Sequence, residues 1–402
     1  MSTEEPTGTS AHTDHWGDPI SEERQAEMQG ILDAWEAPGA DHDDKKGPFD
    51  KNPGKYYGVL LTGADVSWLA ERVRGKNGWV SNLHLEGAHL GEAHLEGADL
   101  SEAHLEGADL SKAHLEGAVL GRTHLEEANL LFARLERAIL LQAHLERADL
   151  RGAHLDGAVL GRTHLEEADL SSARLAGAAL HEAHLERARL QGVWVDSNTV
   201  LTDAMFDDKT QLGDIHWGGV GAVNLTRLDW GRVPRLGDET GLKRDAKAED
   251  YEAAVRVYRQ LAAQLRAQGM SEVADRFLYR AQVVQRRVLR KRRRFGQWLG
   301  SWFLAALAGY GYAPSRTIVW YLATVTAFAV AYYFLGSTQG RAFLPDGALV
   351  FSVTSFHGRG FFPESLNFES WVTRLAALEA VTGLFIEISF IATFTQRFFG
   401  AK

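Results

Sequence analysis

The chain has 402 residues, of which 45% are apolar and 24% are charged, with a formal net charge of −10 and no cysteine. Its length allows two or three domains, and the lack of cysteine excludes a disulfide framework and a thiolate metal site. The sequence opens without an apolar signal-peptide core, so we expect any membrane delivery to depend on internal segments. No phosphate-binding loop, nucleophile elbow or metal-ligand motif is recognisable, and we expect neither an enzyme nor a cofactor.

The N-terminal region is acidic and rich in Gly, Pro and Asp. Residues 1–55 hold too few aliphatic side chains to form a core, so we predict a mostly disordered arm with a short helix near Ser21–Trp35. Residues 56–80 contain the stretch "LTGADVSWLAERV", which we interpret as the N-terminal cap of the domain that follows.

A five-residue repeat dominates the middle of the chain. From Leu85 to Leu190 a leucine stands at every fifth position, in 22 consecutive repeats, and alanine usually stands two residues earlier. A period of five fits neither a helix nor a plain strand and predicts a solenoid with a repeating corner. The repeats resemble the A(D/N)LXX units of the pentapeptide-repeat family. This resemblance implies a right-handed quadrilateral β-helix over residues 81–240, with leucine and alanine inside and a degenerate C-terminal end.

Four repeats per coil place outward residues in columns with a period of 20. One column contains His104, His124, His144 and His164, each two residues before a glutamate. Such a ladder could sense pH or bind a row of divalent metal ions. The simpler interpretation, which we prefer from sequence, is a solvated face left by repeat duplication, without a bound metal. A further column, with Val119, Ile139 and Val159, is apolar and predicts a packing surface.

A helical hairpin is predicted at residues 241–294. Tyr251, Val255, Tyr258 and Leu265 form one stripe of a first helix, and Gly269 ends it. The second helix ends in the basic run 286–294, "RRVLRKRRR". Such a run could bind nucleic acid, but the apolar segments that follow favour the cytoplasmic side of a membrane.

Residues 295–402 have the pattern of a membrane domain. We expect an interfacial helix rich in tryptophan, a first span at Thr317–Leu335, which is 19 residues without a charge, and a second span at Leu375–Phe394. A fully buried soluble helix is the alternative for the first segment. Two spans with basic flanks predict a multi-pass protein of the cell inner membrane with both termini in the cytoplasm.

A shorter apolar segment, Pro345–Ser355, lies between the two spans and is long enough for a re-entrant helix. Together with the segment "WVTRLAALEAVTGLFIEISFIATFTQRF", it resembles the pore helix and inner helix of the prokaryotic potassium-channel-like family. The resemblance implies a hinge at Gly383. Glu379 and Glu387 share a side of the helix with it, and we expect Glu379 to bond the pore-loop backbone or Arg359. The implied pore-loop residues are Thr354, Ser355, Phe356, His357, Gly358, Arg359, Gly360 and Phe361.

The filter departs from that family. It is two residues short, and Arg359 stands where the family has tyrosine, so potassium selectivity is not implied. Arg359 could turn away and pair with a carboxylate, or line the path and favour anions.

From these patterns we expect an ion-channel-like homotetramer, because one pore loop per chain requires four copies around an axis. Ions would permeate passively under regulation by the cytoplasmic repeat domain, and the partners would be the lipid bilayer and inorganic ions, without nucleic acid. Two alternatives are a non-conducting membrane-anchored scaffold and a DNA mimic that binds a topoisomerase, as some pentapeptide-repeat proteins do.

Overall fold

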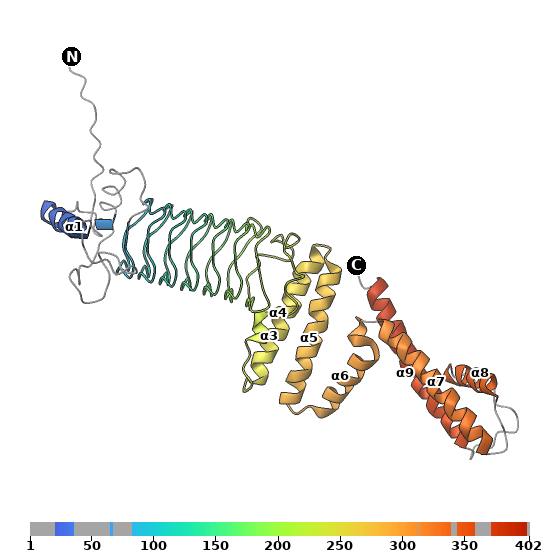
Figure 1. Cartoon of the computed structure of the whole chain (residues 1–402). Coiled ribbons are helices and arrows are strands. Elements are labelled where there is room, and N and C mark those ends of the chain that lie inside the picture. The colour runs from blue at the N-terminus through green and yellow to red at the C-terminus, as the bar shows by residue number, and fades with distance from the viewer. Residues whose placement is uncertain are drawn as a thin grey trace. The chain divides into compact units, whose positions relative to one another are not determined.

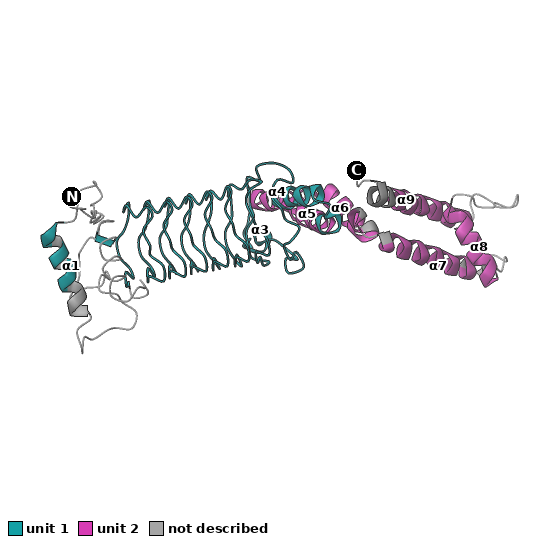
Figure 2. Ribbon diagram, turned by 90° about the horizontal axis from the view of Figure 1, so that it is seen from above, with its two compact units in different colours: residues 1–246, 256–274 teal, residues 247–255, 275–402 magenta. Residues whose placement is uncertain are grey.

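The computed structural model describes residues 21–35, 65–66, 83–312, 314–338, 344–357 and 371–399. The chain divides into two compact units, residues 1–246 with 256–274 and residues 247–255 with 275–402 (Figure 2). In the first unit, α1 (Glu22–Trp35) confirms the helix predicted near Ser21–Trp35. The cap predicted over 56–80 lies outside the described residues, apart from the buried Asp65 and Val66.

The repeats form a parallel β-helix (Figure 1). Single β-bridges join residues that are 20 apart, as in His104↔His124. Within a repeat, the leucine and the alanine before it point inward, and Leu105 and Ala103 are both 0% exposed. The corner is made by a residue with positive φ, such as Gly107 at 64°. Because backbone groups bond the next coil, as Leu105 N does to His124 O at 2.7 Å, the stack satisfies its own backbone polar groups.

The register of the β-helix changes beyond Leu190, where the strict leucine repeat ends. The offset between bridged residues grows from 20 to 21 at Ala179↔Val200 and to 22 at Arg189↔Gln211. Each extra residue lies in a turn held by an aspartate. Asp196 Oδ1, for example, accepts hydrogen bonds from the backbone N–H groups of Asn198 and Thr199, both at 3.0 Å. The described bridges continue to His216, short of residue 240, where the sequence predicted the end of the β-helix.

Helical segments follow the last coil within the first unit. They are α3 (Gly237–Thr240) and the part of α4 (Ala248–Ala267) that begins at residue 256. The Tyr258 hydroxyl of α4 donates to Glu239 Oε2 at 2.9 Å and accepts from the Leu236 N–H at 3.0 Å. Gly269, with φ of 77°, ends α4 as predicted.

The second unit is helical, and its last three helices are long, short and long, in the order of the three apolar segments of the sequence. That the two long helices span a membrane stays a prediction. The elements of this unit are the first part of α4 (residues 248–255), α5 (Ser271–Lys291, of which residues from 275 belong to this unit), α6 (Phe295–Ala308), the 3-10 turn η1 (Gly309–Gly311), α7 (Pro314–Thr338), α8 (Pro345–Phe356) and α9 (Trp371–Phe399).

The short helix α8 packs against both α7 and α9. One core cluster contains Tyr332, Ala348, Val372 and Ala376, and a second contains Leu307, Val325, Phe356 and Ile386. Each cluster therefore draws side chains from all three of these helices, and the second also draws Leu307 from α6.

The outer faces of the same helices are apolar. Val319 of α7 is 64% exposed, and Phe385 of α9 is 57% exposed. In the part of the chain that the structure describes, one helical segment is long and apolar enough to cross a membrane: 315–334, with mean hydropathy 1.5. Only 22% of its most apolar window is buried.

Candidate functional site

Glu379 lies where the three C-terminal helices meet. It is 0% exposed and stands on α9. The hydroxyl of Tyr332, from α7, donates to its Oε2 at 2.7 Å, and the hydroxyl of Ser352, from α8, bonds its Oε1. Glu379 therefore ties α7 and α8 to α9. The sequence predicted that the partner would be the loop backbone or Arg359, but the described partners are two hydroxyl groups, and Arg359 lies outside the described residues.

Gly383 follows one helical turn after Glu379 and meets the end of α8. A Cβ atom at this position would overlap the carbonyl oxygen and carbon of Phe356, the last residue of α8. Phe356 is 1% exposed, and its ring packs edge-on against Tyr321 of α7 with centroids 4.9 Å apart. Gly383 thus lets the backbones of α8 and α9 approach more closely than any side chain would permit. Its predicted role as a hinge stays a prediction.

Glu387, a further turn along α9, faces His357 at the C-terminal end of α8. His357 Nε2 lies 3.4 Å from Glu387 Oε1, and its Nδ1–H donates to the Val353 carbonyl at 2.8 Å. Both side chains line an open pocket of about 520 Å³, whose other walls are mostly apolar residues of α7 and α9, among them Ile318, Tyr321 and Phe390. The glutamates and the glycine predicted to share a side of α9 therefore all face α7 or α8.

The other pore-loop residues are only partly described. Thr354 donates its hydroxyl to the Val350 and Phe351 carbonyls of its own helix, at 3.0 and 2.9 Å. Ser355 is buried, with 2% exposure. The predicted filter residues Gly358, Arg359, Gly360 and Phe361 lie outside the described residues.

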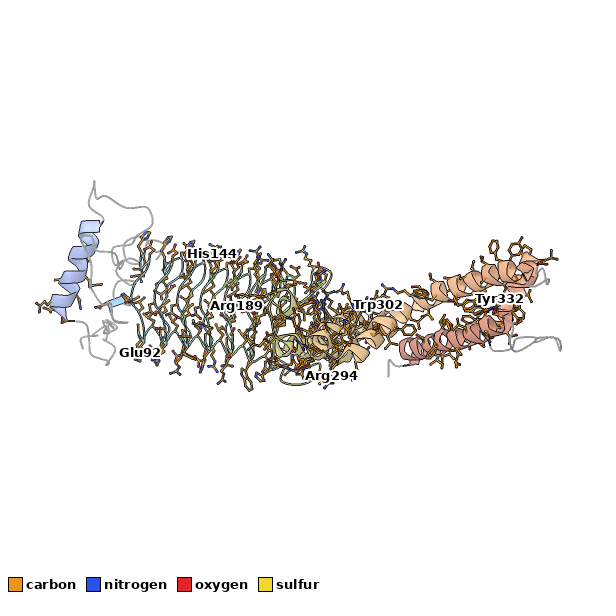
Figure 3. All side chains as sticks on the ribbon, turned by 90° about the horizontal axis from the view of Figure 1, so that it is seen from below. Glu92, His144, Arg189, Arg294, Trp302 and Tyr332 are labelled. Atoms are coloured by element: carbon orange, nitrogen blue, oxygen red, sulfur yellow. The ribbon has the colours of Figure 1, made fainter. Side chains whose placement is uncertain are left out.

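The predicted histidine ladder stands on the outside of the β-helix, and Figure 3 marks its member His144. The rings of His104, His124, His144 and His164 stack at 4.7 to 4.9 Å between centroids. The Nδ1 atom of each ring lies 3.0 to 3.3 Å from Oε1 of the glutamate two residues later. The predicted period of 20 is therefore confirmed, and it brings imidazole and carboxylate groups into contact.

Sequence reasoning did not single out Tyr332 or Ser352. Both are uncharged polar residues in apolar helices, where a hydroxyl group needs an internal partner. The sequence feature that could have identified them is the presence of these hydroxyl groups in apolar segments that lie near a glutamate-containing apolar segment. Thr123 and Thr163 were also missed. They replace the inward alanine, and their hydroxyls donate to the Leu100 and Leu140 carbonyls at 2.8 Å.

Comparison with known proteins places the repeats in a family. A family model described as pentapeptide repeats matches in 8 copies, with matched stretches at residues 81–117, 103–142, 113–152, 128–166 and 153–192. No curated protein sequence matches the chain. The repeats, their β-bridges and this match together make this part of the chain a pentapeptide-repeat β-helix.

Three solved structures illustrate the similarity. HetL, a pentapeptide repeat protein from the cyanobacterium Nostoc sp. strain PCC 7120, is 23% identical, with a TM-score of 0.21, over 37% of this chain and 83% of HetL. Rfr23 from the cyanobacterium Cyanothece 51142 is 30% identical, with a TM-score of 0.17, over 26% of this chain and 63% of Rfr23. The fluoroquinolone resistance protein QnrB1 is 21% identical, with a TM-score of 0.17, over 39% of this chain and 87% of QnrB1.

Proposed function

We propose that this pentapeptide-repeat protein is a subunit of a tetrameric, ion-channel-like membrane pore, in which ions permeate passively and the β-helix acts as a cytoplasmic regulatory domain. The observation that carries the proposal is the packing of α8. This helix has 12 residues, too few to cross a bilayer, and it lies against two helices of 25 and 29 residues. A long helix, a short helix and a second long helix in this order are what a two-span pore subunit needs.

A membrane is the environment that the outer faces of these helices favour. Large apolar side chains are exposed on α7 and α9, and they require cover by lipid or by other copies of the chain. On α6, Leu299, Trp302 and Phe303 are also exposed, directly after the basic run 286–294. Tryptophan at headgroup depth beside clustered arginine favours an interfacial helix on the cytoplasmic side.

Burial of a carboxyl group among these helices also supports the proposal. A carboxyl group within a bilayer is costly unless it has internal partners, and Glu379 has two hydroxyl partners within the subunit. It therefore does not need to face lipid, and it fixes α8 between the long helices. Since each chain supplies one α8, we propose four copies around the pore axis. We assign no ion preference, because Arg359 replaces the tyrosine of the related filters.

A flux assay separates the pore from a non-conducting scaffold. The purified full chain would be reconstituted into one set of vesicles with a potassium-sensitive dye and a second set with a chloride-sensitive dye. Its insertion would be verified by protection of the C-terminal helices from protease. We expect potassium or chloride flux above that of protein-free vesicles. Inserted protein without any flux would support the membrane-anchored scaffold instead.

A second candidate function is a DNA mimic that binds a topoisomerase. The observation in its favour is the row of glutamates along the β-helix, which includes Glu106, Glu126 and Glu146. Arginines in other columns weaken the likeness of the β-helix to a phosphate backbone, because they add positive charge and pair with further carboxylates: Arg122 with Glu102, Arg134 with Glu116, Arg147 with Glu127, and Arg162 with Glu182. Inhibition of DNA supercoiling by the purified chain at stoichiometric concentration would favour this candidate over the pore.

A further inference from the structure

The histidine ladder continues over six coils. Its members are His84, His104, His124, His144, His164 and His184. Successive ring centroids are 4.6 to 4.9 Å apart, and the ring planes differ by 24° at most. Since the coil spacing fixes the distance between rings, the ladder presents its nitrogen atoms in a regular row.

The glutamates of the ladder lie between the rings. Glu166 Oε1 is 3.3 Å from His164 Nδ1 and 3.4 Å from His184 Nδ1, so one carboxylate oxygen contacts two imidazoles. On another side of the β-helix, Glu96 Oε1 lies 2.8 Å from His94 Nδ1 and 3.5 Å from His114 Nδ1. The same three-residue arrangement therefore occurs in two separate columns.

The second carboxylate oxygen provides independent evidence. In eight glutamates of the two columns Oε2 is buried and has no hydrogen-bond partner among the described residues: Glu86, Glu106, Glu126, Glu146, Glu166 and Glu186 in the ladder, and Glu116 and Glu136 in the other column. Burying a carboxylate oxygen without a partner is costly. A cation held by the same carboxylate would compensate this cost.

We propose that the ladder, together with the group His94–Glu96–His114 of the other column, binds divalent first-row transition-metal cations, and that Zn²⁺ fits their donors. Imidazole nitrogen and carboxylate oxygen are ligands that Zn²⁺ prefers, with bonds of about 2.0–2.2 Å. Two ligands of one ion are thus at most about 4.4 Å apart. In the described residues five groups have all their ligand atoms within 4.8 Å: His84–Glu86–His104, His94–Glu96–His114, His104–Glu106–His124, His164–Glu166–His184 and Glu126–His144–Glu146. Shifts of a few tenths of an ångström would therefore suffice.

The arrangement limits how many ions the described groups hold. His104 belongs to two of the five groups. If it offers the same ring nitrogen to both, at most four groups are filled at once. Each ion would join neighbouring coils through side chains, in addition to the backbone bonds between them. Metal binding would thus stiffen the β-helix, a property that is independent of whether the C-terminal helices conduct ions.

The test compares the full-length parent with a variant that loses one group. His164 and His184 occur together in a single group, so His164→Gln with His184→Gln removes that group alone. His89→Gln is the matched control, because His89 is an exposed histidine of the same repeats and belongs to none of the five groups. Each protein, purified in detergent and stripped with a chelator, would be titrated with zinc chloride in a calorimeter.

We expect the parent and His89→Gln to bind the same number of Zn²⁺ ions and the double variant to bind one fewer. Glu166→Gln, which keeps both imidazoles, should weaken binding at the same group. Circular dichroism would verify that the β-helix is intact, and Co²⁺ in place of Zn²⁺ would report imidazole ligation by its visible absorption. Equal Zn²⁺ binding by the parent and the double variant, or no binding by the parent, would overturn the proposal.

Discussion

Gly383 of α9 lies directly against the carbonyl oxygen of Phe356, the last residue of α8. A side chain at residue 383 would have to displace backbone, which yields less readily than the far end of a flexible side chain. The contact fixes the C-terminal end of α8, after which the chain enters the predicted filter. A glycine that resembles a channel hinge in the sequence therefore lies, in the structure, at a close contact between the backbones of two helices.

Gly383→Ala should consequently destabilise the helical unit. We expect a loss of about 1–3 kcal/mol, because the added methyl group forces α8 and α9 apart. Gly347→Ala is the matched control, since a Cβ at residue 347 of α8 meets no atom within 4 Å. That change should leave stability unchanged or raise it by up to about 1 kcal/mol, through the lower flexibility of the unfolded chain. Thermal unfolding of both variants in detergent would measure the effects, and equal melting temperatures would refute the role given to the Phe356 contact.

Glu379 should be needed for the assembly of the three helices. Glu379→Ala leaves the Tyr332 hydroxyl without its carboxylate partner, whereas the Ser352 hydroxyl keeps its bond to the Val325 carbonyl at 2.9 Å. A buried polar group left unsatisfied costs about 1–3 kcal/mol. We expect the proposed tetramer to dissociate at a lower temperature in detergent. Glu379→Gln, which retains the shape and an acceptor oxygen, should have the smaller effect. A tetramer of Glu379→Ala as heat-resistant as the parent would count against this account.

The first coil of the β-helix should respond to pH through His84. The hydrogen bond between His84 Nδ1 and Glu86, at 2.7 Å, raises the pKa of His84 above its ordinary 6.5, although burial lowers it. Because the folded state favours the protonated ring, the resulting stability is fully present below pH 6.5 and is lost as the pH rises through the folded-state pKa. Glu86→Gln should shift the His84 titration midpoint downward in an NMR titration. A midpoint that does not move would contradict the assigned cause.

The proposed topology predicts the location of two reporters. A reporter fused after Lys402 should read as cytoplasmic and one inserted near Gln339 as periplasmic, since the basic run 286–294 precedes the first span and Arg397 follows the second apolar segment. Alkaline phosphatase and green fluorescent protein fusions would measure this in bacteria. Readings on the same side for both positions would rule out a single crossing between them.

The repeat domain was predictable because the same pattern of leucine and alanine recurs in each of its five-residue units. Leucine and alanine at fixed spacing determine what is inside, and Leu85 to Leu190 keep that spacing without interruption. The order of α7, α8 and α9 was also predictable from the lengths of their apolar segments. The turns after Leu190 were harder to predict from the sequence. Single inserted residues near Asp196 and Asp207 interrupt the five-residue period there without changing the fold.

Partners across helices could not be predicted from the sequence. A carboxyl group in an apolar helix predicts a partner but does not identify it, since Tyr332 and Ser352 are 47 and 27 residues away from Glu379 along the chain. Their pairing depends on how α7 and α8 rotate against α9. The carboxylate oxygens of the ladder present the same difficulty, because the spacing between His164 and Glu166 does not reveal that the ring of His184 lies on the other side.

Single-channel recording in planar bilayers tests the central claim most directly. The purified full-length protein would be incorporated between asymmetric KCl solutions and compared with Arg359→Gln. The account predicts discrete current steps in the parent, and the same reversal potential in the parent and the variant if the Arg359 side chain is turned away from the axis. Protein that inserts into the bilayer but gives no current steps, in the parent and the variant alike, would contradict the assignment of a pore.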